Sequence, residues 1–164
     1  MSLFVTLNLV LCVAFLLCYA HRILYVCYTR VKRPKRYPPA PCDRRYAVLI
    51  CARNEAGVLG YLLDSVADQD YPGDLIDVFV CADNCTDGTA AVARAHGAEV
   101  VERYSHRQVG KGYALEALVR HVFREHGREA YHGFLVVDAD NLLDPRCITE
   151  MHNCVCAGAR VVTG

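Results

Sequence analysis

Residues 133–141 read GFLVVDADN, an apolar run that ends in two carboxylates one residue apart. The run has the length and composition of a buried strand, and Asp138 and Asp140 follow at its end. Residues i and i+2 project from the same side of a strand, so the two carboxylates can converge. Two like charges held close together need a cation, and carboxylate oxygens favour Mg²⁺ or Mn²⁺ over zinc. The alternative is a solvated turn that caps the next helix, but Asp144 can already serve as that cap.

Three further apolar runs precede this stretch, and a segment with helical periodicity follows each run. Strands are expected at Tyr46–Cys51, Ile76–Ala82, Glu99–Glu102 and Gly133–Val137, and helices at about Ala56–Asp68, Asp87–His96, Gly112–His126 and Asp144–Cys154. Strands separated by single helices imply an α/β fold, with a mostly parallel sheet covered by helices on both faces. Ligands of such sheets bind at the carboxyl ends of the strands, where the polar residues of this chain gather.

Capping residues support these helix boundaries. Thr86 or Asp87 can accept hydrogen bonds from the first free amides of the second helix, and Gly97 follows its end. Asp144 stands at the expected N-cap of the fourth helix and Pro145 at its first position.

Two polar clusters follow the first and second expected strands. Arg53, Asn54 and Glu55 come after the first; taken alone, they are best explained as the cap of the next helix. Asp83 lies at the end of the second strand, before the cap itself. Its carboxylate can accept hydrogen bonds from the imide or hydroxyl groups of a ligand, and this interpretation and a capping role are equally supported.

A short glycine-rich turn, Gly110-Lys111-Gly112, opens the third expected helix. It is not a Walker A loop, because Gly112 stands where that motif requires Ser or Thr. Two glycines let backbone amides approach an anion, and Lys111 adds a positive charge. A helix-start turn with a solvated lysine is an equally good interpretation.

The chain of 164 residues has 18 Lys+Arg and 18 Asp+Glu, but these charges are segregated. Residues 1–41 contain six basic residues and no acidic one, which leaves 12 basic and 18 acidic residues for positions 42–164. This acidic excess argues against nucleic-acid binding, and the 54% hydrophobic content argues against disorder. The expected domains are a transmembrane helix at 1–29, a basic Pro-rich linker at 30–44 and an α/β domain at 45–164.

The N-terminal segment Leu3–Ala20 has no charged residue and would span about 27 Å as a helix, close to the thickness of a hydrocarbon core. A cleaved signal peptide is the alternative, but no basic residue precedes His21. All six basic residues follow the apolar span, so the positive-inside rule places the N-terminus outside and residues 30 onward in the cytoplasm. We therefore expect a single-pass protein of the cytoplasmic membrane.

The ten cysteines are not expected to form a disulfide framework in the reducing cytoplasm. Cys147, Cys154 and Cys156 lack the spacing of a zinc site.

Together, these motifs resemble the donor-binding half of a family 2 inverting glycosyltransferase, of the membrane-anchored group that includes poly-N-acetylglucosamine, cellulose and hyaluronan synthases. The matching stretches are Ala52–Glu55, Gln69–Pro72, Cys81–Thr89, Gly110–Leu115 and Val137–Asn141. They follow in family order over roughly residues 45–150. The resemblance implies a Rossmann-like GT-A fold and the transfer of a sugar, with inversion, from a nucleotide-sugar donor to an acceptor hydroxyl of a carbohydrate or lipid-linked acceptor, and it favours a UDP-sugar as the donor.

The resemblance also implies roles for individual residues. The donor-binding residues would be Arg53, Glu55, Asp83, Lys111 and Asp138, and the ligands of Mg²⁺ or Mn²⁺ would be Asp138 and Asp140. Asp83 would contact the uracil or the ribose, and Asp140 would be the more direct metal ligand. The departing diphosphate accumulates negative charge, which a bound divalent cation stabilises as a Lewis acid.

One part of the family pattern is missing. An inverting transferase needs a general base, and the family takes it from an acidic motif well downstream of the D-x-D pair. No Asp or Glu follows Glu150, and Arg160–Gly164 looks like the start of another strand. We therefore expect a truncated chain that binds donor and metal without completing transfer. The alternatives are a non-catalytic, membrane-anchored binding module and a sugar nucleotidyltransferase, which would normally have a Gly-rich basic loop after its first strand.

Overall fold

The computed structural model describes residues 3–31 and 36–163, so Lys32, Arg33, Pro34 and Lys35 of the expected basic linker lie outside the described residues. The chain divides into two compact units, Met1–Arg36 and Tyr37–Gly164.

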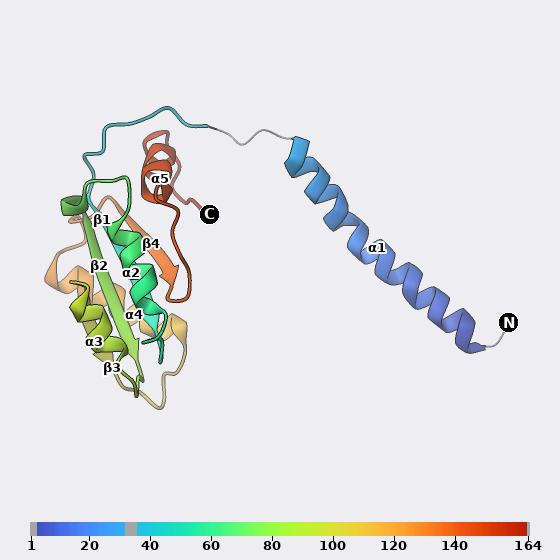
Figure 1. The fold of residues 1–164 in the computed structure, drawn as a ribbon, viewed down its shortest axis with the longest axis horizontal. Coiled ribbons are helices and arrows are strands. Elements are labelled where there is room, and N and C mark those ends of the chain that lie inside the picture. Colours follow the sequence, from blue (N-terminus) through green and yellow to red (C-terminus); the bar gives the residue numbers. More distant parts are fainter. Residues whose placement is uncertain (1–2, 32–35, 164) are drawn as a thin grey trace. The chain divides into compact units, whose positions relative to one another are not determined.

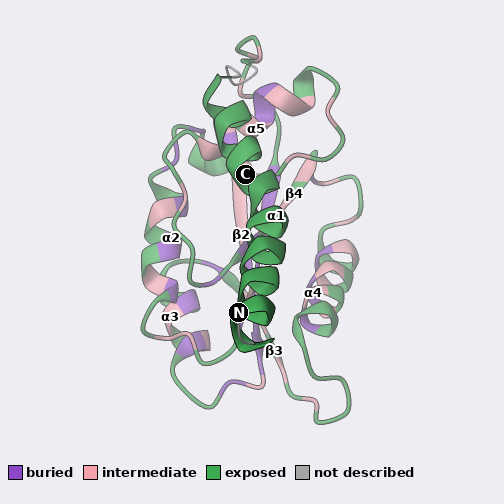
Figure 2. Cartoon of the chain, turned by 90° about the vertical axis from the view of Figure 1, so that its right-hand side faces the viewer, coloured by how far each residue is buried: buried purple, intermediate pink, exposed green. Residues whose placement is uncertain are grey.

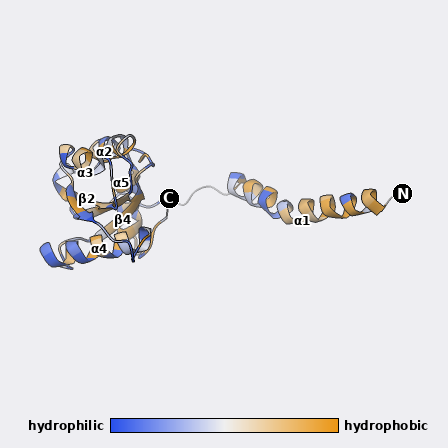
Figure 3. Ribbon diagram, turned by 90° about the horizontal axis from the view of Figure 1, so that it is seen from below, coloured by the Kyte–Doolittle hydropathy of each residue, from blue (hydrophilic) through white to orange (hydrophobic). Residues whose placement is uncertain are grey.

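The first unit is a single long helix, α1 (Leu3–Val31). All of its described residues are exposed (Figure 2), and most of them are hydrophobic (Figure 3). At 1.5 Å per residue, its 29 residues extend about 44 Å, which exceeds the hydrocarbon thickness of a bilayer. Among the described residues it is the one helix long and apolar enough to cross a membrane. The helix continues beyond the expected end at residue 29, because the first helix-breaking residue after it is Pro34.

The second unit is built on a four-stranded sheet, as the alternation of strand and helix predicted. The strands are β1 (Tyr46–Ala52), β2 (Ile76–Asp83), β3 (Glu99–Arg103) and β4 (Gly133–Asp138). They lie in the order β3-β2-β1-β4, and all three pairings are parallel. β1 is therefore the central strand that both β2 and β4 contact (Figure 1). β4 is an edge strand in this sheet, with Phe134 and Val136 exposed.

The sheet is covered on both faces by helices (Figures 1 and 3). The helices are α2 (Leu59–Ala67), α3 (Thr89–Ala95), α4 (Lys111–Glu125) and α5 (Cys147–Cys156), with a short 3₁₀ turn, η1 (Gly73–Leu75), before β2. The residues that α2 and α3 bury belong to the core cluster on one face, and those of α4 belong to the cluster on the other. The predicted arrangement of a parallel sheet between two helical layers is confirmed.

Three helices, α2, α3 and α5, begin two or three residues later than the sequence indicated, whereas α4 begins one residue earlier, at Lys111. Asp87 does cap α3, because its Oδ1 accepts a hydrogen bond from the Thr89 amide at 3.0 Å, but the helix begins only at Thr89. Asp144 likewise accepts from the Arg146 amide at 2.9 Å and forms a turn ahead of α5. Gly97 ends α3 with φ +80°, as expected.

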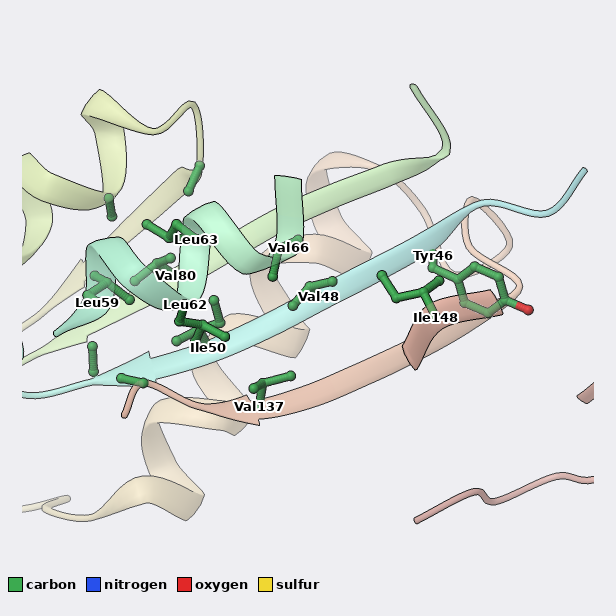
Figure 4. Close-up of a cluster of buried hydrophobic side chains, with 14 of the residues drawn as sticks. Tyr46, Val48, Ile50, Leu59, Leu62, Leu63, Val66, Val80, Val137 and Ile148 are labelled. Carbon is green, nitrogen blue, oxygen red and sulfur yellow. The ribbon is translucent and has the colours of Figure 1, made fainter. Parts of the chain in front are cut away.

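Side-chain alternation along the strands divides the core into two clusters. The cluster under α2 and α3 contains Val48, Ile50, Leu59, Leu62, Leu63, Val66 and Val80 (Figure 4). The cluster under α4 contains Ala47, Leu49, Phe79, Cys81, Ala114, Leu118 and Val122. Because β1 is buried on both faces, its sequence is a continuous apolar run.

A buried histidine fastens the segment before β1 to α5. His152 is fully buried, with Nε2 2.8 Å from the carbonyl oxygen of Pro41 and Nδ1 2.9 Å from the hydroxyl of Tyr46. The carbonyl can only accept, so Nε2 carries the proton and Nδ1 accepts from the tyrosine. Next to it, Asn153 Oδ1 accepts a hydrogen bond from the Ala40 amide at 2.8 Å. Residues 40 and 41 of the expected linker therefore pack on the folded unit.

We expect His152→Ala to destabilise the chain by about 2–4 kcal/mol, because it leaves a cavity and removes the partners of two buried polar groups. Urea unfolding followed by circular dichroism measures the loss. The exposed His106 provides the matched control, and His106→Ala should change stability by no more than about 0.5 kcal/mol. Equal effects of the two substitutions would contradict a structural role for His152.

Candidate functional site

Polar residues gather at the edge of the sheet where the parallel strands end. Cys51 of β1 lies in register with both Cys81 of β2 and Asp138 of β4. Paired residues of a sheet point to the same face, and Asp83 follows Cys81 by two positions. Asp83 and Asp138 are therefore directed to the face covered by α4, a helix that begins at Lys111. Three of the residues singled out from the sequence thus belong to one edge and one face of the sheet.

Lys111 forms an ion pair with Asp138, between Nζ and Oδ1. Both side chains remain about half exposed, so water screens the pair and its stabilisation is small. Gly110 precedes the lysine with φ +126°, a backbone conformation that only glycine adopts readily. This glycine lets the chain turn sharply into α4 and sets Lys111 at the first helical position. The lysine therefore lies beside the end of β4, where an anion can reach it.

The two carboxylates of the D-x-D stretch face solvent. β4 ends at Asp138, and a turn follows in which the Asn141 amide donates to the Asp138 carbonyl at 3.1 Å. Asp138 and Asp140 are exposed, whereas the intervening Ala139 is buried. The alternation of the strand thus continues into the turn and leaves both carboxylates open to a ligand.

These residues do not form a complete metal-binding cage by themselves. Within residues 3–31 and 36–163, no three His, Cys, Asp or Glu side chains lie close enough together to hold a metal ion. Two exposed carboxylates still suit Mg²⁺ or Mn²⁺, because such hard cations take oxygen ligands and commonly complete their coordination with substrate phosphates and water. The donor set therefore fits a cation shared with a phosphate ligand.

Asp83 lies in a different environment, since only 4% of its surface is exposed. Its Oδ1 accepts hydrogen bonds from Arg103 Nη1 at 2.5 Å and from Asn84 Nδ2 at 3.1 Å. Arg103 is itself mostly buried. The sequence interpretation did not include Arg103, although this residue directly follows the expected third strand. Its pairing with Asp83 depends on the register of β3 against β2, which the sequence does not reveal.

The loop after β1 is tied to the loop after β2. Asn54 adopts φ +58°, and its Oδ1 accepts a hydrogen bond from the Thr86 amide at 2.8 Å. The Glu55 amide donates to Thr89 Oγ1 at 2.9 Å, and the Ala56 amide donates to Asp87 Oδ2 at 3.1 Å. The expectation that Asn54 caps the next helix is therefore wrong: its side chain joins two loops.

The same loop carries two of the expected donor-binding residues. Arg53 is exposed, and Glu55 is half-buried. Among the described residues, neither side chain forms a hydrogen bond or ion pair with Asp83, Lys111 or Asp138. Both residues thus follow the end of β1, at the same edge of the sheet as the other candidates but not in contact with them.

Cys51 is a further residue of the site that sequence reasoning missed. Burial is the main cause that raises the pKa of its thiol; the nearby Asp83 carboxylate raises it further, and Lys111 opposes the change. The thiol is therefore neutral near pH 7 and acts as a small apolar surface near Asp83 and Lys111. In the sequence, Cys51 is one cysteine in an apolar strand, and nothing there indicates that it lies near Asp83 and Lys111.

Comparison with known proteins identifies related sequences. A family model described as "Glycosyltransferase like family 2" matches residues 43–164. A 4,4'-diaponeurosporenoate glycosyltransferase of Staphylococcus aureus (strain MRSA252) is 40% identical over 77 residues, which cover 45% of this chain and 20% of the relative. The match thus spans about one fifth of the length of that curated relative.

Two solved structures show the same architecture. The mannosyltransferase PcManGT from Pyrobaculum calidifontis, in complex with GDP-Man and Mn²⁺, has a TM-score of 0.61 and 26% identity, covering 87% of this chain and 43% of that one. S. aureus TarS 1–349 in complex with UDP has a TM-score of 0.54 and 18% identity, covering 69% of this chain and 32% of that one. The latter likeness shows the fold alone. The α/β unit is therefore GT-A-like.

The connection between the first two loops leads to a prediction about pH. Hydrogen bonds, first of all from the Thr89 hydroxyl, hold the pKa of Asp87 below its ordinary value of 3.8. A lowered pKa in the folded state contributes stability that is present above the ordinary value and lost as pH falls through the folded value. We expect Asp87→Asn to be less stable than the wild type at pH 6, with the difference shrinking as the pH falls below 3.8.

Urea midpoints at pH 6 and pH 2.5 measure this difference. Asp68→Asn, which changes an exposed aspartate outside the two loops, serves as the control. If the wild type keeps the same advantage over Asp87→Asn at both pH values, the ionised carboxylate is not what holds the loops together.

Proposed function

Because the chain belongs to the glycosyltransferase-like family 2, we propose that residues 43–164 bind a nucleoside diphosphate sugar together with Mg²⁺ or Mn²⁺. The site would lie at the carboxyl edge of the sheet, on the face covered by α4. In the complete reaction, the sugar would pass with inversion to an acceptor hydroxyl, and the nucleoside diphosphate would leave.

The observation that carries this proposal is the placement of Asp83, Lys111 and Asp138 at one edge and on one face of a parallel sheet. A buried carboxylate that only accepts hydrogen bonds suits the N–H or O–H groups of a nucleoside. A lysine at a helix start suits a diphosphate. The nucleoside and the diphosphate of a nucleotide sugar therefore find suitable partners within one site.

Asp138 and Asp140 would hold the divalent cation, with Asp140 as the more direct ligand. When bound, the cation supplies Lewis-acid stabilisation of the negative charge on the departing diphosphate. Lys111 would add positive charge at the same group once a phosphate oxygen replaces Asp138 as its partner. Breaking the Lys111–Asp138 pair costs little, because both side chains are half exposed.

Arg53 and Glu55 would complete the donor site from the loop after β1. Their loop is fixed by its hydrogen bonds to Thr86, Asp87 and Thr89, so the two side chains extend from a positioned backbone. We propose that Glu55 lies near the nucleoside and Arg53 near the phosphates.

The choice of nucleobase rests on the resemblance, which favours a UDP-sugar donor. PcManGT, which is 26% identical to this chain, holds GDP-Man and Mn²⁺. Its complex supports a nucleotide sugar bound with Mn²⁺, and both UDP and GDP belong in any binding experiment.

For the acceptor, we propose a carbohydrate or a lipid-linked molecule, as in the membrane-anchored synthases that the sequence resembles. The curated relative is named for 4,4'-diaponeurosporenoate and not for a polysaccharide. Its name therefore supports acceptors other than polysaccharides.

We propose that α1 anchors the chain in the cytoplasmic membrane. Its length and its apolar, exposed surface are those of a membrane-spanning helix. Arg30 at its C-terminal end and the basic residues that follow in the sequence favour a cytoplasmic location for the second unit.

Isothermal titration calorimetry with UDP or GDP tests the metal site. We expect the wild-type chain in detergent to bind one of them at least about tenfold more tightly with Mn²⁺ than without, a difference of about 1.4 kcal/mol. Asp140→Asn should abolish this metal dependence, because it removes a charged oxygen ligand.

Asp144→Asn is the matched control, since it makes the same chemical change four residues away and keeps a good capping side chain. The control should retain the full effect of Mn²⁺. If the wild type binds neither nucleotide in the presence of Mn²⁺, the proposed function is wrong.

Alkaline carbonate extraction tests the anchor. The expressed chain should remain in the membrane pellet, and deletion of residues 3–31 should move it to the soluble fraction. Mass spectrometry of the pelleted protein should find the N-terminal segment intact. Loss of this segment from the mature chain would instead identify a cleaved signal peptide.

A further inference from the structure

Asp83 and Arg103 form the most deeply buried ion pair of the candidate site. The side chains are 6% and 12% exposed, and Oδ1 lies 2.5 Å from Nη1. A buried carboxylate is costly unless a partner of opposite charge accompanies it. The guanidinium of Arg103 is that partner, and their charge-assisted hydrogen bond fixes the position of the Asp83 carboxylate.

The same guanidinium also holds the chain segment that leads to Lys111. Arg103 Nη2 donates to the carbonyl oxygen of Gln108 at 2.7 Å. Gln108 lies three residues before the first residue of α4, which is Lys111. The two ends of one planar group therefore join the carboxylate at the end of β2 to the loop that carries the lysine.

Asn84 reinforces this connection from the other side of Asp83. The side-chain nitrogen Nδ2 of Asn84 donates to Asp83 Oδ1, and its side-chain oxygen Oδ1 accepts from the Ser105 backbone amide at 2.8 Å. The backbone of Asn84 has φ +53° and donates to the Arg103 carbonyl at 2.7 Å. Both side-chain hydrogen bonds to Asp83 thus go to Oδ1, which leaves the lone pairs of Oδ2 for a ligand.

From this geometry we propose that Arg103 is a positioning residue that sets nucleobase selectivity. It pairs with Oδ1 of Asp83, so that Oδ2 is presented to a ligand in a fixed orientation, and it fixes the loop before Lys111 relative to that carboxylate. The inference rests on the proposed nucleotide site and adds to it a residue that holds the nucleoside end and the diphosphate end at a constant separation.

An acceptor-only carboxylate distinguishes nucleobases by their protons. Uracil presents N3–H and guanine presents N1–H on the Watson–Crick edge, whereas N3 of cytosine carries a lone pair. Such a lone pair would face the negative oxygen of Asp83. Binding of UDP or GDP should therefore exceed binding of CDP in the wild type, and this preference should depend on Arg103.

The test measures dissociation constants of UDP, GDP and CDP with Mn²⁺ for the 164-residue chain in detergent. Arg103→Gln removes the charged partner of Oδ1, so Asp83 is no longer held where Oδ2 can accept from the N–H of uracil or guanine. We expect the dissociation constant of the preferred nucleotide to rise at least about tenfold, as for loss of a charge-assisted hydrogen bond. The dissociation constant of CDP should rise less. The selectivity ratio, which is the dissociation constant of CDP divided by that of the preferred nucleotide, should fall by about the same factor.

Arg103→Lys separates the two tasks of the guanidinium. The ammonium group can still pair with Oδ1 of Asp83 but lacks the planar fork that reaches Asp83 and Gln108 together. We expect this variant to keep the selectivity ratio within about threefold of the wild type and to bind every nucleoside diphosphate more weakly. It also carries the test if Arg103→Gln does not fold, which circular dichroism and urea unfolding reveal.

Arg94→Gln is the matched control, because Arg94 forms an ion pair of the same length with Glu102 at an exposed position. It should leave both affinity and selectivity unchanged. A folded Arg103→Gln with the wild-type ratio overturns the inference, as does an Arg103→Lys that loses the ratio. A wild type that binds none of the nucleotides contradicts the proposed function itself, whereas selective binding unaffected by Arg103 contradicts only this inference.

Discussion

The parallel pairing of β1 with both β2 and β4 is the constraint on which the rest of the structure depends. Parallel pairing brings the carboxyl ends of three strands to one edge, although at least 23 residues of chain lie between one of these strands and the next. The register then determines which side chains share a face. Because Cys51, Cys81 and Asp138 are aligned, Asp83 and Asp138 project toward the helix that begins with Lys111. A shift of one residue would direct either carboxylate to the opposite face.

Much of the fold could be predicted from the sequence because it follows from local patterns. The apolar runs, the helical periodicity and caps such as Asp87 predicted the strands, the helices and their order. The position of Asp83 and Asp138 at strand ends was also visible, since it needs only the end of an apolar run. These inferences depend on a few neighbouring residues each, and tertiary structure did not reverse them.

The features that could not be predicted depend on contacts between distant segments. Arg103 looked like an ordinary surface residue until the register of β3 placed it against Asp83. Asn54 had the composition of a helix cap, but its left-handed backbone turns the side chain toward Thr86 in the next loop. Asn54 and Asn84 both have a left-handed backbone conformation. Nothing in the sequence distinguishes either of them from an asparagine that caps a helix. The starts of α3 and α5 lie later than expected because the side chains of Asp87 and Asp144 first stabilise a turn ahead of each helix.

The attachment of Pro41 and Ala40 to α5 has a mechanical consequence. Tension applied to the chain before residue 40 meets the hydrogen bonds of His152 and Asn153 before it reaches β1. The load is then shared with α5 instead of being concentrated on the first residue of the central strand. A strand that organises the whole edge of the sheet is in this way shielded from pulling at its amino end.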